Sequence, residues 1–200
     1  MINLFCYGSL LNSCQLGQHD TENCLLTPAL IHGYRRAWSI DLKSGFTSVA
    51  VVKDGSSSCN GAIISVEQQS LFELDLRESN YTRTLISSEQ LEVQHNRTWD
   101  KECFVYTVAS HTSPTENTPI LQSYIDVVLN GCMRIDKTYQ LENYAFCREF
   151  IRSTIGWESP WVNDRKAPRY PRALVYEPSN FLVFNEIDSL LTELVSYTPT

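Results

Sequence analysis

The sequence LFELDLRESNYTR, at residues 71–83, carries the pattern from which the rest of the chain can be interpreted. Its apolar residues fall on one broad arc of a helix in which successive residues turn by about 100°: Leu71, Phe72, Leu74 and Leu76. Asp75 and Glu78 fall inside the same arc. Burying a polar group without a partner costs about 2–7 kcal/mol. We therefore expect each carboxylate to have a bonding partner or a chemical use.

The two carboxylates differ in their place on this expected helix. Asp75 lies in its middle, which suits structural hydrogen bonding, whereas Glu78 lies at its end, where a cleft can open beside it. Two interpretations of Glu78 are open: a half-exposed helix-terminal residue, or a proton-transfer group in a cleft. Desolvation by the apolar arc would favour the neutral form of the carboxyl group, which suits a group that carries a proton.

The composition is that of an ordinary folded chain. It has 200 residues, of which 42% are hydrophobic and 20% charged, enough for one domain with an elaboration or a small subdomain. The net charge of −7 argues against general nucleic-acid binding. No apolar run approaches the roughly 18 residues of a membrane span. The first residues lack the features of a signal peptide, so we expect a cytoplasmic protein with no membrane partner.

Cysteine usage and motif content bear on cofactors. The seven cysteines are odd in number and widely spaced, and no CxxC occurs, which favours reduced thiols over disulfides or a zinc site. Neither GxGxxG nor GxxxxGK[ST] is present, so no nucleotide-binding loop is indicated. We therefore expect no metal and no cofactor.

Strand patterns dominate the first half of the chain and helix patterns the second. Strands are predicted at residues 2–7, 29–40 (with Gly33 as a bulge), 81–86, 91–94 and 102–109. The turn-rich residues 54–58 separate two further strand patterns, at 48–53 and 59–66, and predict a hairpin. Helices are predicted at residues 67–78, 120–133, about 137–155 and around 187–195. This order predicts the α+β class and not βαβ repetition.

A tight turn follows the first strand. Its residues are Tyr7, Gly8, Ser9 and Leu10. A Gly-Ser turn after a buried strand can expose successive backbone N–H groups, which suits an anion or a developing oxyanion. In isolation, the same four residues also describe an ordinary strand-ending turn.

Tyr81 and Arg83 follow Glu78 closely. Residues two apart on a strand face the same side, so the two side chains are expected to share a face. Tyr81 then supplies a hydroxyl to a cavity. Arg83 is a carboxylate clamp, a structural ion-pair partner or a solvated strand residue.

Three motifs in this order resemble the γ-glutamylcyclotransferase family. They are FCYGSLL at residues 5–11, LDLRE at residues 74–78, which matches the family's LDxxE, and the Y-x-R at residues 81–83. HGYRRAW, at residues 32–38, and SYIDVVLNGC, at residues 123–132, also resemble family segments. The resemblance covers about two-thirds of the chain and stops near residue 133.

The resemblance implies a small, closed, mixed β-barrel flanked by helices, formed by residues 1–133. Residues 134–200 would then be a helical and loop extension packed on the same domain. By position, the turn at residues 7–10 would hold a γ-glutamyl group through backbone N–H contacts, and Glu78 would be the catalytic base.

The reaction implied by the resemblance is metal-independent cleavage of a small-molecule γ-glutamyl compound, releasing 5-oxoproline and an amine or amino acid. The YGSL turn together with LDxRE is slightly more similar to the family members that act on glutathione. However, the residue after YGSL is not the aromatic residue that those members commonly have at this position. Two alternatives are a non-catalytic binding module on the same barrel and a γ-glutamyl-removing enzyme of a biosynthetic pathway.

One later segment, residues 157–172, carries a local charge of +2 and two tryptophans, Trp157 and Trp161. It is interpreted either as a contact for an anionic substrate arm or as a solvated loop tied down by the tryptophans.

Overall fold

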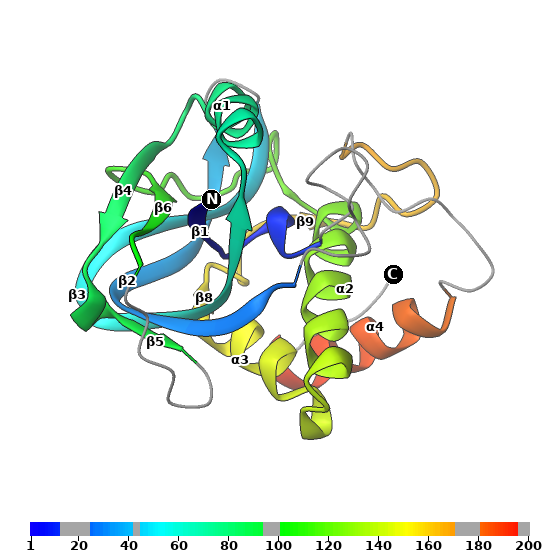
Figure 1. Ribbon diagram of the computed structural model, residues 1–200. Helices are drawn as coiled ribbons and strands as arrows, with labels where there is room; N and C mark the ends of the chain where they lie inside the picture. The colour runs from blue at the N-terminus through cyan, green and yellow to red at the C-terminus, as the bar shows by residue number, and fades with distance from the viewer. Residues whose placement is uncertain (13–24, 42–44, 94–100, 171–180, 196–200) are drawn as a thin grey trace.

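The computed structural model describes residues 1–12, 25–41, 45–93, 101–170 and 181–195 (Figure 1). Its centre is a mixed sheet in the order β4-β6-β1-β3-β2-β5, with β8 added beside β2. The strands are β1 (Ile2–Cys6), β2 (Thr27–Asp41), β3 (Phe46–Val66), β4 (Thr82–Ile86), β5 (Leu91–Val93), β6 (Cys103–Thr107) and β8 (Thr154–Ile155). The β1–β6 and β2–β8 pairs are parallel, and the other pairs are antiparallel.

The α+β class with a mixed sheet and flanking helices is confirmed, but a closed barrel is not. Within the described part of the chain, the end strands β4 and β5 do not pair, so hydrogen bonds do not close the sheet. β1 lies inside the sheet, and its residues after Ile2 are all buried. This burial on both faces explains why the first strand does not alternate between apolar and polar residues; its one polar side chain, Asn3, is buried and donates to the carbonyl of Glu102.

β3 corrects the predicted hairpin. It is one strand of 21 residues, in which residues 48–53 and 59–63 pair with β2 instead of with each other, and residues 62–66 pair with β1. The register shifts opposite Gly33, whose φ of 81° matches the predicted bulge. Between the two segments, the Asp54 carboxylate accepts hydrogen bonds from the N–H and Oγ of Ser56. The turn-forming residues are thus used in an irregular stretch of strand and do not reverse the chain.

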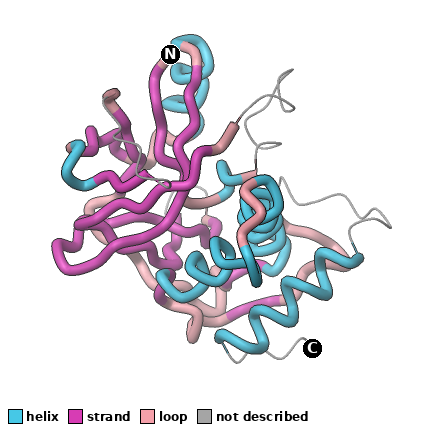
Figure 2. The backbone as a smooth tube through the Cα atoms, turned by 60° about the horizontal axis from the view of Figure 1, so that its bottom comes forward, coloured by secondary structure: helices cyan, strands magenta, loops and turns pink. Residues whose placement is uncertain are grey.

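Over the residues that the structure describes, four α-helices and a second, two-stranded sheet complete the fold. The elements are α1 (Gln68–Arg77), α2 (Gln122–Thr138), α3 (Ala145–Ser153), α4 (Phe181–Val195) and the parallel pair of β7 (Ile120–Leu121) with β9 (Trp161–Val162). Figures 1 and 2 show α2, α3 and α4 gathered beside the sheet, with α1 apart from them. No described helix is long and apolar enough to cross a membrane.

The predicted helix at residues 137–155 is wrong in its first part. α2 runs on to Thr138, and a break follows in which Gln140, Asn143 and Tyr144 have positive φ. The buried Asp136 carboxylate then accepts hydrogen bonds from the N–H groups of Phe146 and Cys147, at 2.8 and 3.0 Å. A side chain from the end of α2 therefore caps α3 as a separate helix.

The expected apolar arc of α1 is also wrong in part. Leu71 and Leu74 are buried, but Phe72 is 58% and Leu76 63% exposed. Asp75, expected to face the core, is about one-third exposed and has structural partners outside α1, described below.

Candidate active site

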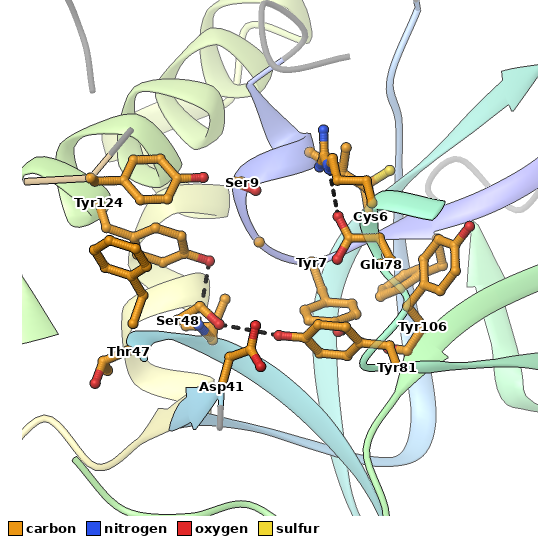
Figure 3. A pocket seen from close by; sticks show the side chains of 17 residues that line it. Cys6, Tyr7, Ser9, Asp41, Thr47, Ser48, Glu78, Tyr81, Tyr106 and Tyr124 are labelled. Carbon is orange, nitrogen blue, oxygen red and sulfur yellow. Dashed lines mark hydrogen bonds and ion pairs between the residues drawn. The ribbon is translucent and has the colours of Figure 1, made fainter. Parts of the chain in front are cut away.

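A cavity of about 290 Å³ lies where the turn after β1 meets the end of α1 (Figure 3). Its size is near the lower end for small-molecule sites. All four turn residues predicted to bind substrate line it: Tyr7, Gly8, Ser9 and Leu10. Glu78 and Tyr81, also predicted, line it as well. The fold thus brings two separate motifs of the sequence to one hollow.

The turn is a short 3-10 helix, Ser9–Leu11, that begins at Gly8. The N–H of Leu11 donates to the carbonyl of Gly8 at 2.9 Å. The first N–H groups of a helical turn have no acceptor within it, so those of Ser9 and Leu10 are the candidates for binding an oxyanion. A Cβ on Gly8 would lie 2.9 Å from Val49 Cγ2, so this close approach requires glycine.

Helix α2 packs directly against the end of the turn. A Cβ on Gly131 would lie 2.5 Å from the carbonyl carbon of Leu11 and 2.6 Å from the backbone nitrogen of Asn12. The Asn12 side chain also donates to the carbonyl of Val127 at 3.2 Å. The turn therefore rests directly on the helix backbone, which fixes its position.

Glu78 caps the C-terminal end of α1. Its N–H donates to the carbonyl of Leu74 at 2.7 Å, and its own carbonyl accepts from the N–H of Tyr81 at 2.8 Å. Arg77 Nε donates to Glu78 Oε1 at 2.7 Å, and both side chains are 19% exposed. Among the described residues, Glu78 Oε2 forms no hydrogen bond. The backbone turn thus places Glu78 and Tyr81 together, and one carboxylate oxygen is held while the other is available.

Tyr81 and Arg83 do not share the cavity. The Tyr81 hydroxyl lies 3.2 Å from Ser48 Oγ. Burial raises the pKa of Tyr81 to about 12, although the hydrogen bond with Ser48 acts in the opposite direction. Arg83 is not among the cavity-lining residues; it forms an ion pair with Asp75 at 3.2 Å. Of the three roles predicted for Arg83, the structure agrees with that of a structural ion-pair partner. Asp75 also accepts a hydrogen bond from the Tyr106 hydroxyl at 2.7 Å.

Tyr124 is a cavity residue that sequence reasoning did not single out. Its hydroxyl accepts a hydrogen bond from the Val49 N–H at 3.3 Å, and burial raises its pKa well above the usual value. The Tyr7 hydroxyl, in contrast, is engaged by donating to the carbonyl of Tyr106 at 2.7 Å. The Tyr124 hydroxyl has no acceptor among the described residues, so its proton is available to a bound molecule. The signal in the sequence was a phenol on the apolar face of a predicted helix, where its hydroxyl needs a partner.

Tyr170 brings the C-terminal part of the chain to the cavity. Its ring packs edge-on against that of Tyr124, with centroids 4.8 Å apart. Asp164 holds this segment, because its carboxylate accepts from the N–H and hydroxyl of Ser123 at 2.8 and 2.6 Å and from the N–H of Arg169 at 2.7 Å. The family resemblance stopped before this segment, and the interpretation of residues 157–172 as a substrate contact rested on their basic charge and not on Tyr170.

Over its described residues, the basic segment at 157–172 agrees with the interpretation of a loop that tryptophan side chains hold in place. The Trp157 ring packs edge-on against Trp38, with centroids 5.0 Å apart. Arg165 pairs with Asp126 on α2 at 2.7 Å and with Asp188 on α4 at 2.8 Å. Arg165 therefore joins three parts of the chain.

Within the described ranges, no three His, Cys, Asp or Glu side chains form a group that could hold a metal ion.

The comparisons with known proteins agree with this arrangement. A family model described as gamma-glutamyl cyclotransferase, AIG2-like, matches residues 4–124. No curated protein matches the chain in a sequence comparison.

Three solved structures illustrate the likeness in fold. One, named gamma-glutamyl cyclotransferase, is 12% identical with a TM-score of 0.56, covering 92% of this chain and 98% of that one. The Homo sapiens protein loc79017, described as uncharacterized, is 12% identical with a TM-score of 0.54, covering 93% and 97%. YkqA from Bacillus subtilis is 15% identical with a TM-score of 0.50, covering 71% and 54%. These identities support the fold alone. Because the family model spans more than half of the chain, the protein belongs to the gamma-glutamyl cyclotransferase, AIG2-like family.

Proposed function

We propose that the protein is a γ-glutamylcyclotransferase that releases 5-oxoproline from a small γ-glutamyl compound. The observation that carries this proposal is the meeting of the Glu78 carboxylate and the turn at residues 7–10 in one cavity. Family membership supports the reaction class.

The reaction is an internal aminolysis. The α-nitrogen of the γ-glutamyl group attacks its own γ-carbonyl carbon, a five-membered ring closes, and the bond to the leaving nitrogen breaks. Because both reacting groups belong to one molecule, holding that molecule in a folded conformation supplies much of the acceleration. Two protons pass from the α-nitrogen, which starts as an ammonium, to the leaving amine. One carboxylate can accept and return each of them in turn.

Glu78 is the proposed proton carrier. Arg77 holds Oε1, which leaves Oε2 as the atom that takes the proton. The proposed oxyanion donors are the N–H groups of Ser9 and Leu10 together with the hydroxyl of Tyr124, which keeps its proton because burial raises its pKa. Losing one such donor typically costs about 10²–10³ in rate.

The test is a 5-oxoproline assay on purified protein with glutathione, a γ-glutamyl dipeptide and ε-(γ-glutamyl)-lysine. Glu78→Gln keeps the shape of the side chain but removes its basicity, so we expect its kcat to fall by about 10²–10⁴ with every substrate that the wild type uses. The matched control is Glu73→Gln, the same change on an exposed position of the same helix, which should retain activity.

Absence of product from a folded wild-type protein would overturn the proposal in favour of a binding module. Full activity of Glu78→Gln would keep the reaction and reject Glu78 as the proton carrier.

A further inference from the structure

Helix α1, which ends at the proposed proton carrier, has few apolar contacts to hold it in place. Of its ten residues, Leu71 and Leu74 are the two that are buried. An isolated helix of this length is at best marginally stable in water, so its position depends on contacts with the rest of the fold. Glu78 follows the helix end directly, and its N–H donates to the Leu74 carbonyl. Any contact that fixes the last turn of α1 therefore also fixes the proposed proton carrier.

The Asp75 carboxylate, in this last turn of α1, contacts two strands. Its Oδ1 accepts a hydrogen bond from the Tyr106 hydroxyl on β6 at 2.7 Å, and its Oδ2 pairs with Arg83 on β4 at 3.2 Å. The Arg83 guanidinium also lies over the Phe104 ring, 5.3 Å from the ring centroid. Asp75 precedes Glu78 by three residues, which is about one helical turn. The polar anchor of the helix thus lies one turn before the proposed proton carrier.

Tyr106 is held at both ends, and its second hydrogen bond leads to the turn after β1. Its hydroxyl donates to Asp75, whereas its backbone carbonyl accepts a hydrogen bond from the Tyr7 hydroxyl at 2.7 Å. Burial raises the pKa of Tyr106, so its hydroxyl keeps the proton that it donates. Tyr7 is the first residue of the turn at residues 7–10. Two hydrogen bonds therefore join the helix of the proposed proton carrier to the turn of the proposed oxyanion donors.

Neither of these hydrogen bonds takes the place of a substrate contact. The Tyr106 ring lines the cavity, but its hydroxyl acceptor, Asp75, is not among the cavity-lining residues. Figure 3 shows the Tyr106 hydroxyl pointing away from Tyr124, with Glu78 between the two phenols. The link from Asp75 through Tyr106 can thus act on the shape of the site without touching the substrate.

We infer that Asp75 and Tyr106 are positioning residues, and that their hydrogen bond sets the distance between the Glu78 carboxylate and the N–H groups of the turn. The proposed reaction requires both groups at one γ-carbonyl, because the carboxylate moves protons between its two nitrogens while the N–H groups stabilise its oxygen. A displacement of about 1 Å can cost about 10² in rate. This inference rests on the proposed function.

The first experiment measures kcat and KM of Tyr106→Phe by the 5-oxoproline assay, with the substrate on which the wild type is most active. The variant keeps the ring and loses the hydrogen bond to Asp75. We expect kcat to fall by about 10- to 100-fold and KM to stay within about threefold, because positioning is lost and no substrate contact is removed. The matched control is Tyr34→Phe, a buried tyrosine outside the cavity, which should keep both constants.

The second experiment tests rescue at Asp75. Asp75→Asn keeps an acceptor for the Tyr106 hydroxyl and should keep kcat within about threefold of wild type, whereas Asp75→Leu should lose as much as Tyr106→Phe. Tyr7→Phe breaks the other hydrogen bond of the same link. Combined with Asp75→Leu, it should add little to the loss of the single variants, because either break releases the same distance. All variants are assayed under conditions in which circular dichroism shows them to be folded.

Three results would overturn the inference while leaving the proposed function in place. They are a wild-type kcat in Tyr106→Phe, equal losses of kcat in Asp75→Asn and Asp75→Leu, and losses that multiply in the double variant. A wild-type protein that releases no 5-oxoproline from any of the substrates would instead overturn the proposed function, and the inference with it.

Discussion

Arg77 Nε donates to Oε1 of Glu78 across 2.7 Å, so the proposed base is oriented by its own neighbour in the sequence. Arg77→Met removes this contact and leaves the Glu78 carboxylate free to rotate. We expect kcat to fall by about 10-fold, because a misplaced reacting group loses much of the benefit of positioning. The kcat of Arg77→Lys should lie between those of the wild type and of Arg77→Met, since lysine keeps the charge but not the planar geometry of the guanidinium group. Steady-state kinetics check this, and an undiminished kcat in Arg77→Met would count against an orienting role.

Tyr124→Phe removes a cavity phenol whose hydroxyl proton has no acceptor among the described residues. We expect kcat to fall by about 10²-fold through loss of an oxyanion donor. The Val49 N–H also loses its acceptor, which should lower the free energy of unfolding by about 1–3 kcal/mol. Urea unfolding separates the second effect from the first. Tyr34→Phe is the control, because Tyr34 is buried but lies outside the cavity. Equal kcat losses in the two variants would reject the specific role of Tyr124.

Gly131→Ala tests the packing of α2 on the turn that follows β1. In an open helix, alanine would be favoured over glycine by about 1 kcal/mol. Here the new Cβ would lie within 2.6 Å of the backbone at Leu11 and Asn12, so the sign should reverse, with a loss of about 1–3 kcal/mol in unfolding free energy. Activity should fall as well, because the turn must shift. Gly55→Ala is the control, since nothing lies within 4 Å of its Cβ position. A Gly131→Ala protein as stable as wild type would show that the helix and turn separate easily.

Arg165→Met removes the cation shared by Asp126 and Asp188. Asp126 is only 3% exposed, and an uncompensated buried charge should lower the unfolding free energy by about 3–5 kcal/mol. Burial raises the pKa of Asp126 and Arg165 lowers it, so the variant should raise this pKa further. The folded variant then binds a proton more tightly than the unfolded chain does, and it loses stability as pH rises through the folded-state value.

The stability deficit of Arg165→Met relative to wild type should therefore be smaller near pH 5 than near pH 8, as measured by urea unfolding at each pH. Arg148→Met breaks an exposed pair with Glu193 and should have a smaller effect. A deficit that grows on acidification would contradict this assignment of the charges.

Local patterns predicted the parts of the fold that depend on neighbouring residues. The first strand, the bulge at Gly33 and the helix before Glu78 follow from apolar spacing and turn chemistry over a few positions. The predicted hairpin failed because residues 54–58 satisfy turn preferences equally well inside a long irregular strand. The helical wheel predicted a wide apolar arc on α1. Apolar spacing alone does not determine which part of that arc packs against the rest of the protein, and only Leu71 and Leu74 are buried.

The rest depends on contacts between distant segments. Arg36 is fully buried, and its guanidinium donates to Thr154 Oγ1 and to the carbonyls of Asn60 and Phe150. Nothing near Arg36 in the sequence indicates these partners. Tyr170 likewise joins the cavity only because Asp164 fastens its segment to α2. The family motifs identified the proposed reacting end of the cavity, whereas the contributions of Tyr124 and Tyr170 became visible only in three dimensions.

The position of Tyr170 late in the chain has a consequence for how the protein matures on the ribosome. A nascent chain that has emerged as far as residue 133 already contains the YGSL turn, Glu78 and Tyr124. It lacks Tyr170 and the Asp164 side chain that anchors it. The part of the cavity lining that Tyr170 forms is therefore completed last, after the proposed proton carrier and its turn have been synthesised.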